Sequence, residues 1–110
     1  MPANRVRGEV ALVLGDDRFV LRPTYAAIVA LEDALGGVLD LAVQASEGRL
    51  SVRTLAVAFH HCIAEDGRER PDVDVLGERI VAAGVVHAVD TYRALLMAIL
   101  TGGSDADDAR

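Results

Sequence analysis

His60, His61 and Cys62 form the densest group of side chains in this sequence that could hold a metal ion, and Glu65 follows closely. On a helix, adjacent residues point about 100° apart, so His60 and His61 do not converge on one ion. Zinc sites favour spacings that return ligands to one face, or paired cysteines two to four residues apart. Cys62 falls instead on an apolar stripe, where a free cysteine behaves as a small hydrophobic residue. We therefore predict no metal site here.

Two further patterns could carry chemistry, and neither meets its geometric requirements. Cys62 could use His87 as a base only through tertiary packing, and no third residue is indicated to orient the imidazole. Asp72-x-Asp74 lacks the spacing of Asp, Gly and terminal Glu that a calcium-binding loop needs. A helix start explains these two residues better, with Asp72 accepting hydrogen bonds from free backbone N–H groups and Asp74 complementing the helix dipole. We expect a protein that is not an enzyme and that holds no metal ion or cofactor.

The elements that would position these residues begin with a β-hairpin over residues 8–23. Gly8 to Leu14 is short, apolar and rich enough in β-branched residues for a buried strand. Residues 15–18 are mainly turn formers, and Phe19 to Arg22 is predicted to return as the second strand. Pro23 closes that strand because it has no N–H to donate to a ladder. An isolated hairpin is marginally stable in water, so it must pack on the rest of the chain.

Apolar residues recur at helical spacing from residue 24 to residue 101, which predicts about five short helices. Thr24 and Ser51 are predicted to cap the first and third of these helices. The first helix has one apolar stripe, formed by Tyr25, Ile28, Leu31 and Leu35. The five helices are predicted over residues 24–35, 38–47, 51–63, 72–83 and 85–100.

These elements predict an α+β fold, in which an N-terminal β-hairpin precedes about five short helices in a single, mainly helical domain. We expect one small domain over residues 1–103, with the hairpin at 8–23 and the helical part at 24–101. Residues 104–110 are small and acidic with nothing to bury, which predicts a disordered tail. A single cysteine cannot form an internal disulfide, and the chain shows neither a signal peptide nor an uncharged membrane span. We expect a soluble cytoplasmic protein of a bacterial host.

Composition and charge exclude other classes of protein. The chain is 52% hydrophobic, which argues against intrinsic disorder, and its formal net charge is −6. Nucleic-acid-binding proteins usually carry a basic patch, whereas most of this chain would repel phosphate. All of the basic residues are Arg and none is Lys, which a GC-rich genome explains more simply than function does. We predict no binding to nucleic acid or membrane.

The last predicted helix is apolar over more than one face. Its apolar residues are Val85, Val86, Ala88, Val89, Tyr92, Leu95, Leu96, Met97, Ile99 and Leu100. A helix this apolar is either central to its own core or partly committed to a partner. The sequence leaves both alternatives open, and the second would make the chain a self-associating or partner-binding module.

Three stretches together resemble a known family. They are residues 4–12 (Asn-Arg-Val-Arg-Gly-Glu-Val-Ala-Leu), Phe19-Val20-Leu21, and residues 31–36 (Leu-Glu-Asp-Ala-Leu-Gly). The family is that of small gene-transfer-agent and siphophage tail proteins, grouped with tail assembly chaperones. The resemblance runs from about residue 4 to residue 100 and is strongest up to Gly36. The alanine-rich helices, the acidity and the glycine before the last helix agree with it.

The resemblance implies a non-enzymatic role in building a phage-like tail. Such chaperones coat the tape-measure protein and recruit tail-tube subunits, which would be the partners of this chain, and homo-oligomerisation stays open. Some related families are described as tail-tube components instead, so a structural tail-tube or tail-completion subunit is the alternative function. The family implies no catalytic residues. As interface positions we predict Leu31, Leu35, Val86, Met97 and Leu100, each of which could equally belong to the core.

Overall fold

Two short strands pair into a β-hairpin at the start of the described chain. In this computed structural model, which describes residues 8–65 and 69–102, β1 (Val10–Leu14) and β2 (Asp17–Leu21) run antiparallel, with Leu14 opposite Asp17. The turn consists of Gly15 and Asp16 alone, and Gly15 has a φ of 64°. A two-residue hairpin turn accepts glycine at its first position for this reason. The predicted turn over residues 15–18 is therefore wrong, because the tighter turn lets Asp17 and Arg18 join the ladder.

Five helices follow the hairpin, which confirms the predicted fold class. They are α1 (Tyr25–Leu35), α2 (Val38–Ser46), α3 (Val52–Cys62), α4 (Val73–Ala83) and α5 (Val85–Thr101). Thr24 and Ser51 cap α1 and α3 as predicted, each accepting a backbone N–H bond of 3.1 Å. Asp72 occupies the N-cap of α4, but its side chain accepts no bond there, so that predicted cap is wrong. The Asp72 carboxylate is exposed, where hydration competes with capping.

One acidic side chain joins the first two helices. Gly36 has a φ of 107° and ends α1, and Gly37, which precedes α2, offers no side chain as a cap. The Glu32 carboxylate, in the last turn of α1, accepts a 3.0 Å hydrogen bond from the Val38 N–H at the start of α2. Glu32 therefore links the two helices.

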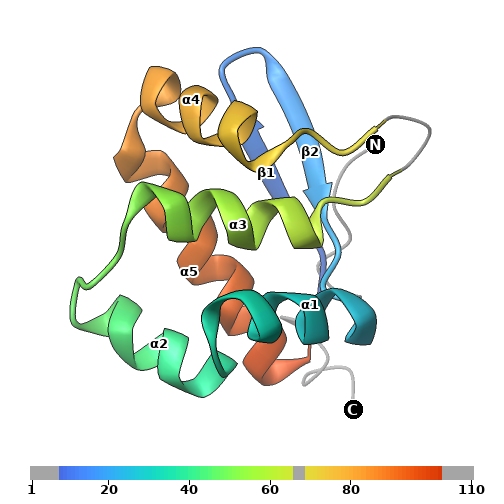
Figure 1. The fold of residues 1–110 in the computed structure, drawn as a ribbon, viewed down its shortest axis with the longest axis vertical. Helices are drawn as coiled ribbons and strands as arrows, with labels where there is room; N and C mark the ends of the chain where they lie inside the picture. The colour runs from blue at the N-terminus through green and yellow to red at the C-terminus, as the bar shows by residue number, and fades with distance from the viewer. Residues whose placement is uncertain (1–7, 66–68, 103–110) are drawn as a thin grey trace.

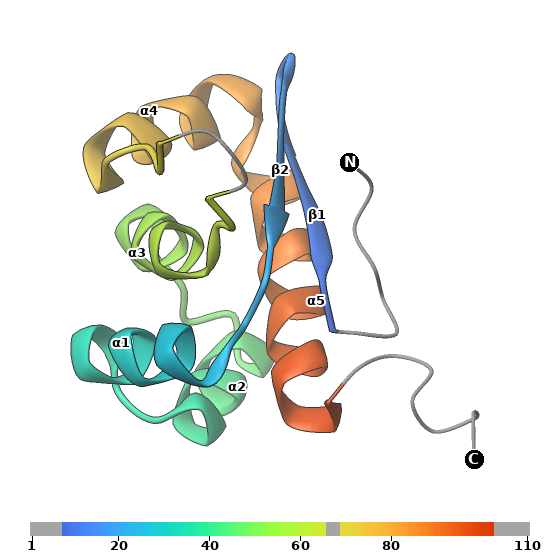
Figure 2. The same cartoon turned by 90° about the vertical axis from the view of Figure 1, so that its right-hand side faces the viewer.

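The helices and the hairpin form two layers (Figures 1 and 2). Helices α4, α3 and α1 lie side by side in one layer with α3 in the middle, and α3 contacts both neighbours. Helix α5 and the hairpin lie behind them, with α5 against β1, and α2 packs beside α5. Because α3 is covered on three sides, five consecutive residues of it, Leu55 to Phe59, are buried.

The core between the layers is mainly aliphatic and includes three aromatic side chains, Phe19, Phe59 and Tyr92. Its largest fully buried side chains are Tyr92 and Phe59, followed by aliphatic residues that include Leu12, Leu21, Leu31, Leu55, Leu76, Ile80 and Leu95. Tyr25, which was predicted on the apolar stripe of α1, is 85% exposed instead. It is the first residue of the helix, and within the stripe only Leu31 is fully buried, with Leu35 packed partly against the core.

The segment after α3 pairs with the end of β2, on the side of that strand that faces away from β1. Ile63 forms a β-bridge with Leu21, and two backbone bonds flank it, from the Arg22 N–H to the Cys62 carbonyl (2.7 Å) and from the Ala64 N–H to the Val20 carbonyl (2.8 Å). An edge covered by the chain itself is protected from pairing with other strands. The predicted tail at 104–110 lies outside the described residues.

Within the described ranges no single helix is long and apolar enough to cross a membrane. Helices α4 and α5 would meet the length and composition only together, and the pair is bent by 119°.

Candidate protein-binding surface

The predicted interface residues divide between the core and the surface. Leu31 has no exposed area and lies in the core, and Leu35 is half-buried against it. Leu31 is therefore not available to a partner, and that prediction is wrong, because the position turns inward toward α3. Val86, Met97 and Leu100 are 72%, 59% and 42% exposed, which places all three at the surface.

These three exposed residues lie on one line along α5. Val86, Asp90, Arg93, Met97 and Leu100 follow one another at intervals of three or four residues, the spacing of one helix face. All five are exposed, and we call them the outer stripe of α5. At 1.5 Å per residue the stripe is roughly 21 Å long. Its apolar side chains stand at both ends, with one acidic and one basic residue between them.

The opposite face of α5 holds the helix in place. Ala88, Tyr92, Leu95 and Leu96 are buried there. Arg93, within the outer stripe, adds a fixed contact to α2, because its guanidinium donates a 3.0 Å bond to the Ala45 carbonyl in the last turn of that helix. A cation at that position also complements the negative end of the α2 dipole. The outer stripe is thus carried by a helix whose other side is anchored in the core, so the first alternative left open by the sequence holds for the buried face of α5, and the opposite face is exposed.

Large apolar side chains are also exposed at two places that sequence analysis did not single out. Leu39 and Val43 on α2 are 71% and 49% exposed, one helical turn apart. Val81 is 62% exposed near the end of α4. The helical spacing of α2 could have predicted the exposure of its two residues. Leu41 and Ala45 lie on one face and are buried, so Leu39 and Val43, which point away from that face, remain on the outside.

The His60, His61 and Cys62 cluster is structural in its contacts. His60 Nδ1 lies 2.8 Å from the Pro71 carbonyl oxygen and ties the end of α3 to the approach of α4. Burial lowers the pKa of His61, and the neighbouring His60 and Arg70 lower it further. Cys62 is buried, and burial raises the pKa of its thiol to about 11, so it is not an activated nucleophile. No group of three or more metal-ligating side chains comes together within residues 8–65 and 69–102.

An ion pair with a buried carboxylate, which sequence analysis missed, fixes the start of the hairpin. Glu9 is 5% exposed and accepts a 2.6 Å hydrogen bond from Arg22 Nε, which lies just after the returning strand. A second pair joins Arg79 of α4 to Asp17 of β2. A buried carboxylate needs such a partner. Glu9 is thus a structural residue that ties the two ends of the hairpin together.

Comparison with known proteins places the chain in a family. A family model described as "Phage tail tube protein, GTA-gp10" matches residues 7–102, which is most of the chain. The match includes the hairpin, all five helices and the whole outer stripe. No curated protein and no solved structure gives a significant match.

Proposed function

Because this chain belongs to the GTA-gp10 family of phage tail tube proteins, we propose that it acts in tail assembly as a chaperone that binds the tape-measure protein and tail-tube subunits. Family membership establishes a phage or gene-transfer-agent tail protein and suggests tail-protein partners or oligomerisation. The chaperone role, the tape-measure partner, action by binding without catalysis, and a site in the bacterial cytoplasm are our proposals.

The outer stripe of α5 is the observation that carries the proposal. Val86, Met97 and Leu100 are exposed to water, although the opposite face of the same helix is already buried in the core. Apolar side chains at both ends of one helix face suit a helix of a partner, which can align its own stripe along the same roughly 21 Å. Three side chains provide only a weak contact, and weak contacts repeated along a long helical protein add up through multivalency.

A structural tail-tube subunit is the second candidate, and the description of the family as phage tail tube proteins favours it. A tube of identical subunits needs two unlike surfaces on each subunit, so that each copy binds the next in the same way. Leu39 and Val43 on α2, together with the outer stripe of α5, would be the surfaces available for such contacts.

Co-expression with the tape-measure protein of the same tail gene cluster tests the chaperone proposal. We expect the tape-measure protein to become soluble and to co-purify with the wild-type chain. Met97→Asp should reduce the co-purified amount at least fivefold, because it places a charge against an apolar contact. Tyr25→Asp is the matched control, since Tyr25 is even more exposed but lies on α1. A tape-measure protein that stays insoluble and unbound would refute the proposal.

Mass spectrometry of purified tails separates the two candidates. A chaperone leaves the particle, so the chain should be absent or far below the amount of the major tail proteins. A copy number equal to that of a tube subunit would establish the structural alternative. Light scattering of the isolated chain gives an independent comparison, because a ring or tube favours the structural role.

A further inference from the structure

A second surface, on the other layer of the molecule, is a groove between α3 and α4. It encloses about 570 Å³ and is open to solvent along its length. Ala56 and Gly77 both line it, and a Cβ added to Gly77 would stand 4.0 Å from the Ala56 Cβ. Val52 and Val81 form apolar walls. The groove does not include the outer stripe of α5.

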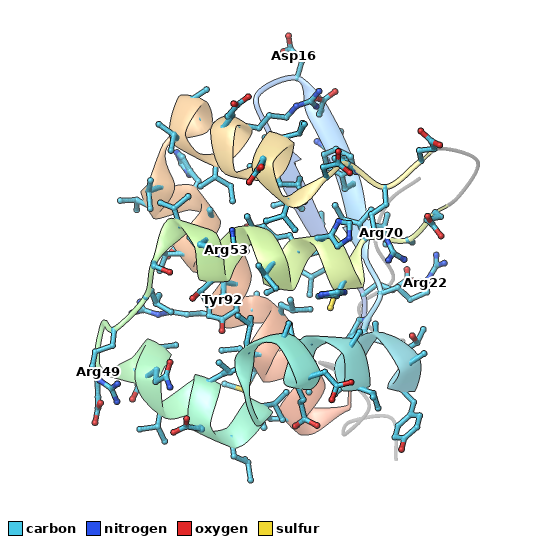
Figure 3. The ribbon with its side chains drawn as sticks, viewed as in Figure 1. Asp16, Arg22, Arg49, Arg53, Arg70 and Tyr92 are labelled. Atoms are coloured by element: carbon cyan, nitrogen blue, oxygen red, sulfur yellow. The ribbon has the colours of Figure 1, made fainter. Side chains whose placement is uncertain are left out.

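The rims of this groove carry opposite charges. Asp74 and Glu78 stand one helical turn apart on the α4 rim, where they are neighbours on one face of the helix. Arg53 projects from the α3 rim, as Figure 3 shows. All three are exposed, and none forms an ion pair with another residue in the described part of the chain. The α4 rim is therefore an acidic edge that nothing in the described chain neutralises.

A helix suits this groove better than an extended peptide. Two helices that pack side by side leave a furrow into which the side-chain ridge of a third helix fits. Small residues at the floor let the backbone of the third helix approach closely. The eleven-residue α4 offers roughly 16 Å of contact, enough for about three turns of the occupant.

The charges indicate that the occupant is not a second copy of this chain. Helices α1 and α2 present acidic residues on their exposed sides, Glu32 and Asp33 on α1 and Asp40 on α2, and the outer stripe of α5 brings no net positive charge because Asp90 and Arg93 balance each other. Docking α1 or α2 of another copy would place these carboxylates near Asp74 and Glu78, where like charges repel. A helix with basic residues along one flank would instead neutralise the acidic rim.

We propose that the α3–α4 groove binds an amphipathic helix of a different tail protein, with an apolar stripe on the groove floor and Lys or Arg residues along the flank that meets α4. Only the identification of the partner as a tail protein rests on the proposed function. The groove would then be a second binding surface in addition to the outer stripe of α5, and it would have a preference for basic partners that the stripe does not have.

Two synthetic peptides of 18 residues test the charge preference directly. Both have the same Ala and Leu stripe, and one has Lys on its flank where the other has Glu. Titration into the isotope-labelled chain, followed by amide NMR, should show shifts at Val52, Ala56, Gly77 and Val81. We expect the Lys peptide to bind roughly three- to tenfold more tightly than the Glu peptide. Equal affinities, no binding at millimolar peptide, or shifts confined to α5 would overturn the proposal.

Paired variants separate the groove from a general effect of charge. Glu78→Arg should weaken the Lys peptide several-fold, and Asp33→Arg, which makes the same change in net charge on α1, should leave its affinity unchanged. Equal weakening by both variants would refute a specific site. Gly77→Leu, which fills the floor, should abolish the shifts while the circular dichroism spectrum stays native. Co-purification with the tape-measure protein tests the other proposal. If the wild-type chain does not co-purify with the tape-measure protein, the chaperone role is refuted. If the Lys peptide still binds as expected, the groove proposal stands.

Discussion

Replacing Tyr92 with phenylalanine should stabilise the protein. The Tyr92 side chain has no exposed area, and its hydroxyl oxygen has no hydrogen-bond partner within the described residues. Figure 3 shows the ring in the interior, between α3 and the α1–α2 pair. Tyr92→Phe removes this unpaired polar group and keeps the ring that packs in the core.

Two opposing contributions set the size of the effect. A buried polar group without a partner costs about 1–3 kcal/mol of desolvation. Removing the oxygen leaves a void of roughly 15 Å³, which costs about 0.4 kcal/mol at ~24 cal/mol per Å³. We therefore expect the free energy of unfolding to rise by about 1–2 kcal/mol. For a chain of this size, each kcal/mol raises Tm by roughly 4 °C.

Urea unfolding followed by circular dichroism at 222 nm measures the change, since the chain has no tryptophan. Tyr25→Phe is the matched control: Tyr25 is 85% exposed, and its variant should differ from wild type by less than about 0.5 kcal/mol. A Tyr92→Phe variant that is 1 kcal/mol or more less stable than wild type would refute the reasoning. That result would mean that the hydroxyl has a hydrogen-bond partner, such as an internal water.

Three further predictions concern the core, the thiol and alkaline pH. Leu31→Ala should lower the free energy of unfolding by about 2–5 kcal/mol, whereas Met97→Ala should change it by less than about 0.5 kcal/mol; similar urea midpoints for the two variants would contradict the core position of Leu31. Cys62 should react with a disulfide reagent at pH 8 at least ~100-fold more slowly in the native protein than in urea, and a rate within tenfold would contradict its burial. The native pKa values of Cys62 and Tyr92 are about 11 and about 12, against ordinary values of 9.0 and 10.0. The unfolded chain releases both protons first, so the urea midpoint should fall as the pH rises from about 9 to about 12, and a constant midpoint over that range would contradict the shifts.

Local rules predicted the elements of this fold because their signals lie within a few residues of each other. Thr24 and Ser51 each precede an apolar stripe, and both cap a helix as predicted. The glycine at position 36 marks the end of α1 with its positive φ. The turn at Gly15 was predicted too long because a two-residue and a four-residue turn contain the same residue types, and only the backbone φ distinguishes them.

Longer-range pairings could not be predicted from one sequence. Glu9 and Arg22 are 13 residues apart, and nothing in their spacing shows that the hairpin brings them together. Leu31 and Met97 both lie among apolar residues at helical spacing, yet Leu31 is buried and Met97 is 59% exposed. Periodicity identifies the apolar positions, but the neighbouring helices decide which of them are covered. The same limit applies to the α3–α4 groove, since it exists only where two separate helices meet.

The position of α5 has a consequence for the order in which the molecule is completed. This helix contacts β1, α2, α3 and α4, so it closes the core against most other elements. At about 5–20 residues per second, a ribosome needs roughly 4–16 seconds to extend the chain from the end of β2 to the end of α5. During that interval β1 lacks α5, its main helical neighbour, and the nascent chain holds an unfinished core. Synthesis of α5 completes the core and presents the outer stripe in the same step, so a partner that binds the stripe meets only finished molecules.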